Sequence, residues 1–235
     1  MIYILDIFKI KMTKEKYSIQ MSNKLSISDI KNISLGHEKM TEMLRWFDKV
    51  CRENDLKYWV TGGTLIGTIR HEGWIPWDGD LDVGMYNQDL MKLEKIIDNE
   101  LPANLKYYKA NEWSNTQGVI HTKLKDLYSH YYDGNETGGL CLDIFPYINQ
   151  NNNIIPFNNG WAPICGIPDG FSRNVNDIFP LKECIFENIK VFVPNKYKDI
   201  SKTLWGDFPP KLPPIDERYP HEGKINPFLP RPHNL

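Results

Sequence analysis

The sequence predicts an α+β domain in which one mixed β-sheet is flanked by helices and followed by an irregular, proline-rich C-terminal region. Three observations support this prediction. Two long segments carry apolar residues at helical spacing, several short apolar runs between and after them have strand composition, and the chain from Ile154 onward is rich in proline. The length of 235 residues is enough for one ordinary domain with a substantial core.

The composition excludes several classes of protein. A hydrophobic content of 41% and a charged content of 25% are typical of a soluble globular domain, and a net charge of −2 argues against a nucleic-acid partner. Four widely spaced cysteines form no Cys-x-x-Cys pair, which favours reduced thiols. The apolar N-terminal segment is interrupted by Asp6 and Lys9, so it is a poor signal peptide. No run approaches the roughly 20 apolar residues of a transmembrane segment, and we expect a cytoplasmic protein.

The first long helix is predicted from a capping signal and an apolar face. Residues 1–25 show no sustained periodicity, and we expect a flexible N-terminal tail there. The capping signal Ser26-x-x-Asp29 then marks the start of a helix. One apolar face follows at three- and four-residue intervals, formed by Met40, Met43, Leu44, Phe47, Val50 and Cys51. We expect the folded domain to span residues 26–214, with residues 215–235 as an extended C-terminal tail.

The next elements alternate between strands and helices. Residues 58–60 are an aromatic and β-branched run typical of a strand, and residues 64–70 have three apolar residues on one side of a short helix. Residues 72–77 contain glycine and proline, which predicts an irregular loop anchored by two tryptophans. Residues 81–85 are the second strand, and residues 87–100 are a second long helix that is stopped by a proline.

The second half of the chain supplies the remaining strands of the sheet. Four strand candidates lie at residues 107–110, 119–127, 128–132 and 140–145. Together with the two earlier strands they predict one mixed sheet. The asparagine-rich residues 149–153 are expected to form a plain surface loop. A possible last strand at residues 191–194 and a short helix at residues 196–205 follow, before paired prolines end regular structure.

Three acids stand at alternate positions after the irregular loop, at Asp78, Asp80 and Asp82. Because successive side chains of a strand point to opposite faces, Asp80 and Asp82 share one face while Leu81 points to the core. Two carboxylates facing one way repel unless a cation or a proton joins them, and Mg2+ accepts such a pair of ligands. We interpret Asp80 and Asp82 as metal ligands, the alternative being a solvated acidic strand end. Asp78 either joins them or holds the loop by hydrogen bonds.

A glycine pair directly follows the first strand and opens the short helix. Gly62 and Gly63 lack a Cβ, so backbone N–H groups can approach a phosphate closely. The N-terminus of a helix also favours an anion. We therefore predict that Gly62, Gly63 and Thr64 contact a phosphate of the substrate.

A further acid, Asp143, stands among apolar residues of a predicted strand. A lone carboxylate in a buried strand is costly without a partner. If its strand lies beside that of Asp80, Asp143 is a third metal ligand or the base that takes a proton from an acceptor hydroxyl. The alternative is a structural ion pair with a lysine.

Four basic residues are candidates for phosphate binding. Arg70 and His71 end the short helix and could hold a diphosphate, with a solvated helix C-terminus as the alternative. Lys123 and Lys125 alternate on one strand and therefore share a face. They could neutralise phosphate charge, with an exposed sheet face as the alternative.

The segment from Gly62 to Met85 closely resembles the signature of the LicD and fukutin family. It reads Gly-Gly-Thr-Leu-Ile-Gly-Thr-Ile-Arg-His-Glu-Gly-Trp-Ile-Pro-Trp-Asp-Gly-Asp-Leu-Asp-Val-Gly-Met. The resemblance continues in Lys-Leu-Lys-Asp at residues 123–126 and in Leu-Asp-Ile-Phe-Pro at residues 142–146. The sequence departs from the family pattern at Gly79, where an acid is common, and at Trp205, where a tyrosine is usual.

The resemblance implies a nucleotidyltransferase-like fold and a transferase activity. Family members are divalent-metal-dependent transferases that move phosphocholine or a phosphorylated polyol from a CDP-activated donor to a glycan hydroxyl. By position, Asp80 and Asp82 would bind Mg2+ or Mn2+, Asp143 would be the third acid, and residues 62–64 would form the phosphate-contacting turn. We therefore expect a LicD-like phosphotransferase with a CDP-activated alcohol and a glycan as partners. Nucleotidyl transfer with release of pyrophosphate, and a non-catalytic glycan- or nucleotide-binding module, are the alternatives.

Overall fold

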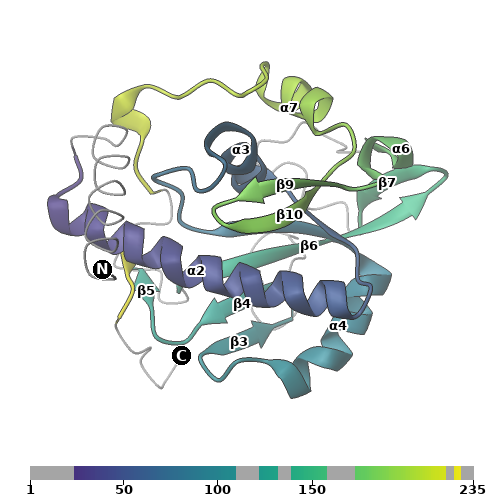
Figure 1. Ribbon diagram of the computed structural model, residues 1–235, viewed down its shortest axis with the longest axis horizontal. Coiled ribbons are helices and arrows are strands. Elements are labelled where there is room, and N and C mark those ends of the chain that lie inside the picture. Colours follow the sequence, from purple (N-terminus) through teal and green to yellow (C-terminus); the bar gives the residue numbers. More distant parts are fainter. Residues whose placement is uncertain (1–23, 110–121, 132–138, 158–172, 221–224, 229–235) are drawn as a thin grey trace, which may run out of the picture.

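The computed structural model describes residues 24–109, 122–131, 139–157, 173–220 and 225–228. Within these ranges a mixed sheet is flanked by helices, as Figure 1 shows, and the predicted α+β class is confirmed. Most of the expected N-terminal tail, residues 1–23, lies outside the described ranges. Among the helices that the structure describes, none is long and apolar enough to cross a membrane.

The sheet has the strand order β1-β2-β6-β4-β3, with β7 and β8 added beside β6. Its strands are β1 (Tyr58–Val60), β2 (Leu81–Tyr86), β3 (Leu105–Tyr108), β4 (Thr122–Asp126), β6 (Cys141–Gln150), β7 (Asn153–Pro156) and β8 (Arg173–Asn174). Only the central pair β2 and β6 is parallel among these pairings. Asp143 is the Cα neighbour of Asp82 on one side and of Lys123 on the other. This register brings two acids and one lysine from three strands into one row.

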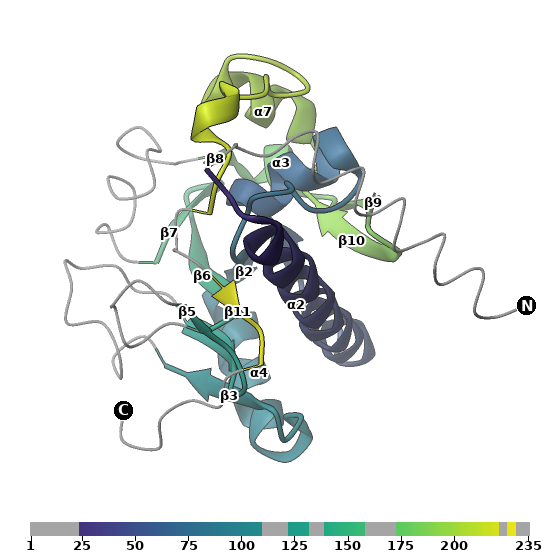
Figure 2. The same ribbon diagram turned by 90° about the vertical axis from the view of Figure 1, so that its left-hand side faces the viewer.

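Helices α2 (Ile27–Glu53) and α4 (Asn87–Glu100) share one apolar core with the sheet. Ser26 and Asp29 form the predicted capping box, and all six residues of the predicted apolar face are buried. Alternate residues of β2 and β6, including Leu81, Val83 and Ile144, belong to the same core. Figures 1 and 2 show α2 lying along one side of the sheet.

The opposite face of the sheet is divided into two halves. Trp59, Phe145 and Tyr147 form an aromatic cluster that packs against residues of α6 (Val175–Ile178) and α7 (Tyr197–Trp205). Asp82 of β2 and Asp143 of β6 lie on the same face of the sheet as this aromatic cluster, nearer the N-terminal ends of their strands. One half of this face therefore stabilises the sheet, while the other half is polar.

Three segments are more regular than the sequence predicts: the asparagine-rich stretch, residues 182–193 and the C-terminal segment. The asparagine-rich stretch is a two-residue hairpin turn between β6 and β7, with Asn151 and Asn152 at positive φ, a conformation that asparagine tolerates. Strands β9 (Lys182–Phe186) and β10 (Ile189–Val193) form a hairpin of which we predicted only the second strand.

The segment expected to be a C-terminal tail contains two short regular elements. It contains a 3-10 helix, η1 (Ile215–Glu217), and the short strand β11 (Ile225–Asn226). Strand β11 pairs with β5 (His130–Tyr131), and Ile225 is only 2% exposed. The attachment depends on pairing with a strand about a hundred residues earlier, which local sequence patterns do not reveal.

Gly84 gives a test of how β2 is held against the aromatic cluster. A Cβ at this position would lie 2.5 Å from the Trp59 ring, so Gly84→Ala should lower the free energy of unfolding by about 1–3 kcal/mol, the usual cost of overpacking. Urea denaturation measures the loss. The double variant Gly84→Ala/Trp59→Phe should lose less than the sum of the two single changes, because the smaller ring relieves the clash. Additive losses would contradict this account.

Candidate metal and phosphate site

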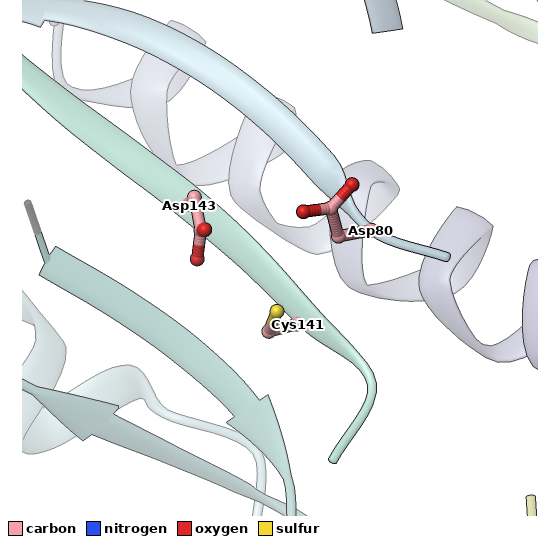
Figure 3. A group of neighbouring side chains, drawn as sticks. All are labelled: Asp80, Cys141 and Asp143. Atoms are coloured by element: carbon pink, nitrogen blue, oxygen red, sulfur yellow. The ribbon is translucent and has the colours of Figure 1, made fainter. Parts of the chain in front are cut away.

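Three potential metal ligands meet at the polar half of the sheet. Asp80 lies just before β2, and Cys141 and Asp143 lie on the neighbouring strand β6. One ligand atom from each residue lies within 4.8 Å of the other two. Figure 3 shows the three side chains on their neighbouring segments. Cys141 is 6% exposed and Asp143 is 5% exposed, while Asp80 is half-buried. Two of the three donors are therefore buried, and the Asp80 carboxylate is partly accessible.

Asp82 occupies a different position, at the N-terminus of α3 (Gly62–His71). Its Oδ2 accepts a hydrogen bond from the Gly63 N–H at 3.1 Å, and its own N–H donates to Thr64 Oγ1 at 2.8 Å. In the described part of the chain, Asp82 does not belong to the group formed by Asp80, Cys141 and Asp143. It is nevertheless the neighbour of Asp143 in strand register. Shared coordination by Asp80 and Asp82 therefore stays a prediction.

The glycine pair makes room for two carboxylates at this helix terminus. A Cβ on Gly62 would collide with Asp82 Oδ2, and a Cβ on Gly63 would collide with Asp78 Oδ2. Gly62 also has a φ of 49°, which glycine adopts without strain. The positive end of α3 thus faces acidic side chains, and direct contact of residues 62–64 with a phosphate remains a prediction.

Lys123 provides the nearest positive charge. Its Nζ lies 2.7 Å from Asp143 Oδ2 and 3.9 Å from Cys141 Sγ. The expected alternative for Asp143, an ion pair with a lysine, is therefore present. Burial lowers the pKa of Lys123, but the neighbouring Cys141 and Asp143 groups outweigh it and raise that pKa above its usual range. Burial, followed by the charge of Asp143, raises the pKa of Cys141.

Lys125 extends the positive charge along the same face. It pairs in register with Cys141 on one side and with Lys106 of β3 on the other. The Nζ atoms of Lys106 and Lys125 lie 4.8 Å and 5.4 Å from the centre of the Tyr108 ring, a cation–π arrangement. Lys125 is only 5% exposed, so an exposed sheet face is the wrong interpretation for this residue.

Arg70 and His71 lie at the other end of α3 from Gly62, although Arg70 is within electrostatic range of Asp78. They end α3, and Arg70 is eight residues, or about 12 Å along a helix, beyond Gly62. The Arg70 guanidinium donates to the backbone carbonyls of Pro210 and Lys211 at 3.2 Å and 2.8 Å. It therefore holds the C-terminal segment, and its contact with a diphosphate stays a prediction.

The loop before Asp80 is held by the predicted anchor Trp74 and by three partners that the sequence did not single out. His37 of α2 is 2% exposed, stacks on Trp74 and lies with Nε2 2.7 Å from the carbonyl oxygen of Asp78. Because a carbonyl can only accept, His37 Nε2 is the donor. Trp74 donates from Nε1 to Thr41 at 2.9 Å and from its N–H to Glu187, in the β9–β10 turn, at 3.1 Å. Trp74 anchors this loop, as expected.

Cys141 is the other residue that sequence reasoning missed. The available signal was its position two residues before Asp143, which places both side chains on one face of a strand. The pattern did not reveal that Asp80 lies close to Cys141, because that depends on the pairing of β2 with β6.

Comparisons with known proteins identify the family of this chain. The model of the LicD/FKTN/FKRP nucleotidyltransferase domain matches residues 55–196. An uncharacterised protein of Rickettsia typhi is 26% identical over 173 residues, which cover 72% of this chain and 47% of the relative. The lipopolysaccharide cholinephosphotransferase LicD of Haemophilus influenzae is 37% identical over 69 residues, covering 28% of this chain and 26% of the relative. The human ribitol 5-phosphate transferase FKRP is 27% identical over 112 residues, covering 48% and 21%.

Among solved structures, the lincomycin-bound lincosamide adenylyltransferase LnuA matches 68% of this chain and 82% of its own, with 15% identity and a TM-score of 0.39. The chain spans about half the length of the first two curated relatives, 47% and 56%. The family model covers more than half of the chain and includes both the glycine turn and the acids. The chain therefore belongs to the LicD/FKTN/FKRP family of nucleotidyltransferase domains.

Proposed function

We propose that this protein is a divalent-metal-dependent phosphotransferase that moves a phosphorylated alcohol from a CDP-activated donor to a glycan hydroxyl. The observation that carries the proposal is the grouping of Asp80 and Asp143, with Asp82 next in register, beside the N-terminus of α3. Two relatives support the chemistry of the transferred group. One is named for cholinephosphate transfer and the other for ribitol 5-phosphate transfer.

The donor atoms of the site fit a small divalent ion. Asp80 and Asp143 supply carboxylate oxygens, the ligands that Mg2+ and Mn2+ prefer, and Asp82 is the nearest further acid in register. We assign Asp80, Asp82 and Asp143 to hold Mg2+ or Mn2+. When bound, such an ion neutralises phosphate oxygens and helps to orient the donor.

The other residues position the two substrates. Lys123 and Lys125 continue the same face with positive charge and would offset the charge of the diphosphate. The acceptor hydroxyl oxygen would bond to the phosphorus next to the alcohol, while the bond from that phosphorus to the oxygen of CMP breaks. CMP leaves with the electron pair, and we assign Asp143 to receive the hydroxyl proton. Catalysis would rest mainly on positioning and charge neutralisation.

The leaving group tests this proposal. The protein, incubated with Mg2+, a glycan acceptor and either CDP-choline or CDP-ribitol, should release CMP. Asp80→Asn and Asp143→Asn should each lower the rate by about 100-fold or more, because the loss of several kcal/mol of charge stabilisation corresponds to at least that factor. Asp55→Asn, a change to an exposed acid of a distant turn, should keep the wild-type rate.

Two outcomes would contradict the proposal. Release of pyrophosphate from a nucleoside triphosphate, without CMP from a CDP-alcohol, would favour nucleotidyl transfer. Donor binding that needs no metal and gives no turnover would favour a non-catalytic module.

His37 is expected to position the metal site through the Asp78 carbonyl. His37→Leu removes the donor and should weaken Mn2+ binding by about tenfold, the lower range for a group that orients metal ligands. His37→Gln keeps an N–H donor and should lose less. Isothermal titration with Mn2+ measures both, with thermal unfolding as the check on stability. Equal Mn2+ affinity in wild type and His37→Leu would assign His37 to packing alone.

A further inference from the structure

Cys141 is part of the acidic site but has no role in the proposed transfer. Its side chain lies on the same strand face as Asp143, and its Sγ is one of the three grouped ligand atoms. Figure 3 shows its sulfur beside the carboxyl groups of Asp80 and Asp143. A thiol at this position has two carboxylates as its nearest possible co-ligands.

The spacing of the three donors is close to that of a metal complex. In zinc sites the metal lies about 2.3 Å from sulfur and about 2.1 Å from oxygen, which separates tetrahedral ligands by about 3.5 Å. The three atoms here lie within 4.8 Å of one another. Side-chain movement of about 1 Å, less than a rotamer change, would bring them to bonding distance.

Positive side chains also lie near the sulfur. Lys123 Nζ lies 3.9 Å from Cys141 Sγ, and Lys125 neighbours Cys141 in register. Cys141 therefore has both possible co-ligands and lysines among its neighbours.

We propose that Cys141 Sγ is a further ligand of this site and gives it a preference for thiophilic divalent ions of the Zn2+ and Cd2+ class. The inference rests on the proposed metal site and adds a sulfur donor to it. Soft thiolates select Zn2+ and similar ions, whereas carboxylates alone suit Mg2+ and Mn2+. Removing the thiol should thus change which ion binds best while leaving the carboxylate contribution in place.

Cd2+ titration of the full chain tests the proposal, because a sulfur–cadmium bond produces an ultraviolet charge-transfer band. Wild type and Cys184→Ser should both show the band, the latter being a matched change of a thiol outside the site. In Cys141→Ser the band should be lost or strongly reduced, and Cd2+ affinity should fall by about 10- to 100-fold. Mn2+ affinity, measured by electron paramagnetic resonance, should change by less than about threefold, since the carboxylates remain.

The outcomes separate this inference from the proposed function. An unchanged band and Cd2+ affinity in Cys141→Ser, with normal Mn2+ binding, would overturn the role of Cys141 and leave the carboxylate site intact. Absence of Mn2+ and Cd2+ binding in wild type would overturn both. If Cys141→Ser unfolds, Cys141→Ala replaces it, because a small apolar side chain suits a buried position.

Discussion

The parallel pairing of β2 with β6 is the constraint on which the site depends. It sets Asp82 opposite Asp143 and Leu81 opposite Leu142, so that one face of both strands is apolar and the other carries the two acids followed by aromatic residues. The apolar face is buried by α2 and α4. A shift of one residue in this register would turn the acids into the core and the leucines outward. Burial of the leucines therefore fixes the register, and with it the positions of the acids.

The acids are tolerated in a buried setting because positive groups surround them. Lys123 forms an ion pair with Asp143, and the N-terminus of α3 faces Asp82 through the Gly63 N–H. Such compensation is only partial in a buried setting. A divalent ion would complete it, and the loop held by His37 and Trp74 keeps Asp80 next to the strand pair.

Local patterns predicted much of this architecture. The cap at Ser26, the buried face of α2 and the bounds of α4 follow from periodicity and propensity alone. The contacts that complete the site could not be read in this way, because Cys141 meets Asp80 only through the pairing of strands some sixty residues apart. The same holds for Arg70, whose partners are carbonyls 140 and 141 residues later. Such long-range contacts depend on topology, which the sequence pattern of one segment does not contain.

The central claim is that a divalent ion binds between Asp80 and Asp143 at the polar half of the sheet. Crystals soaked with Mn2+ and a CDP-alcohol, measured at the manganese absorption edge, test it most directly. The account predicts an anomalous peak within bonding distance of both carboxylates, with the donor diphosphate beside it. A peak elsewhere, or a bound donor with no ion near Asp80 and Asp143, would contradict it.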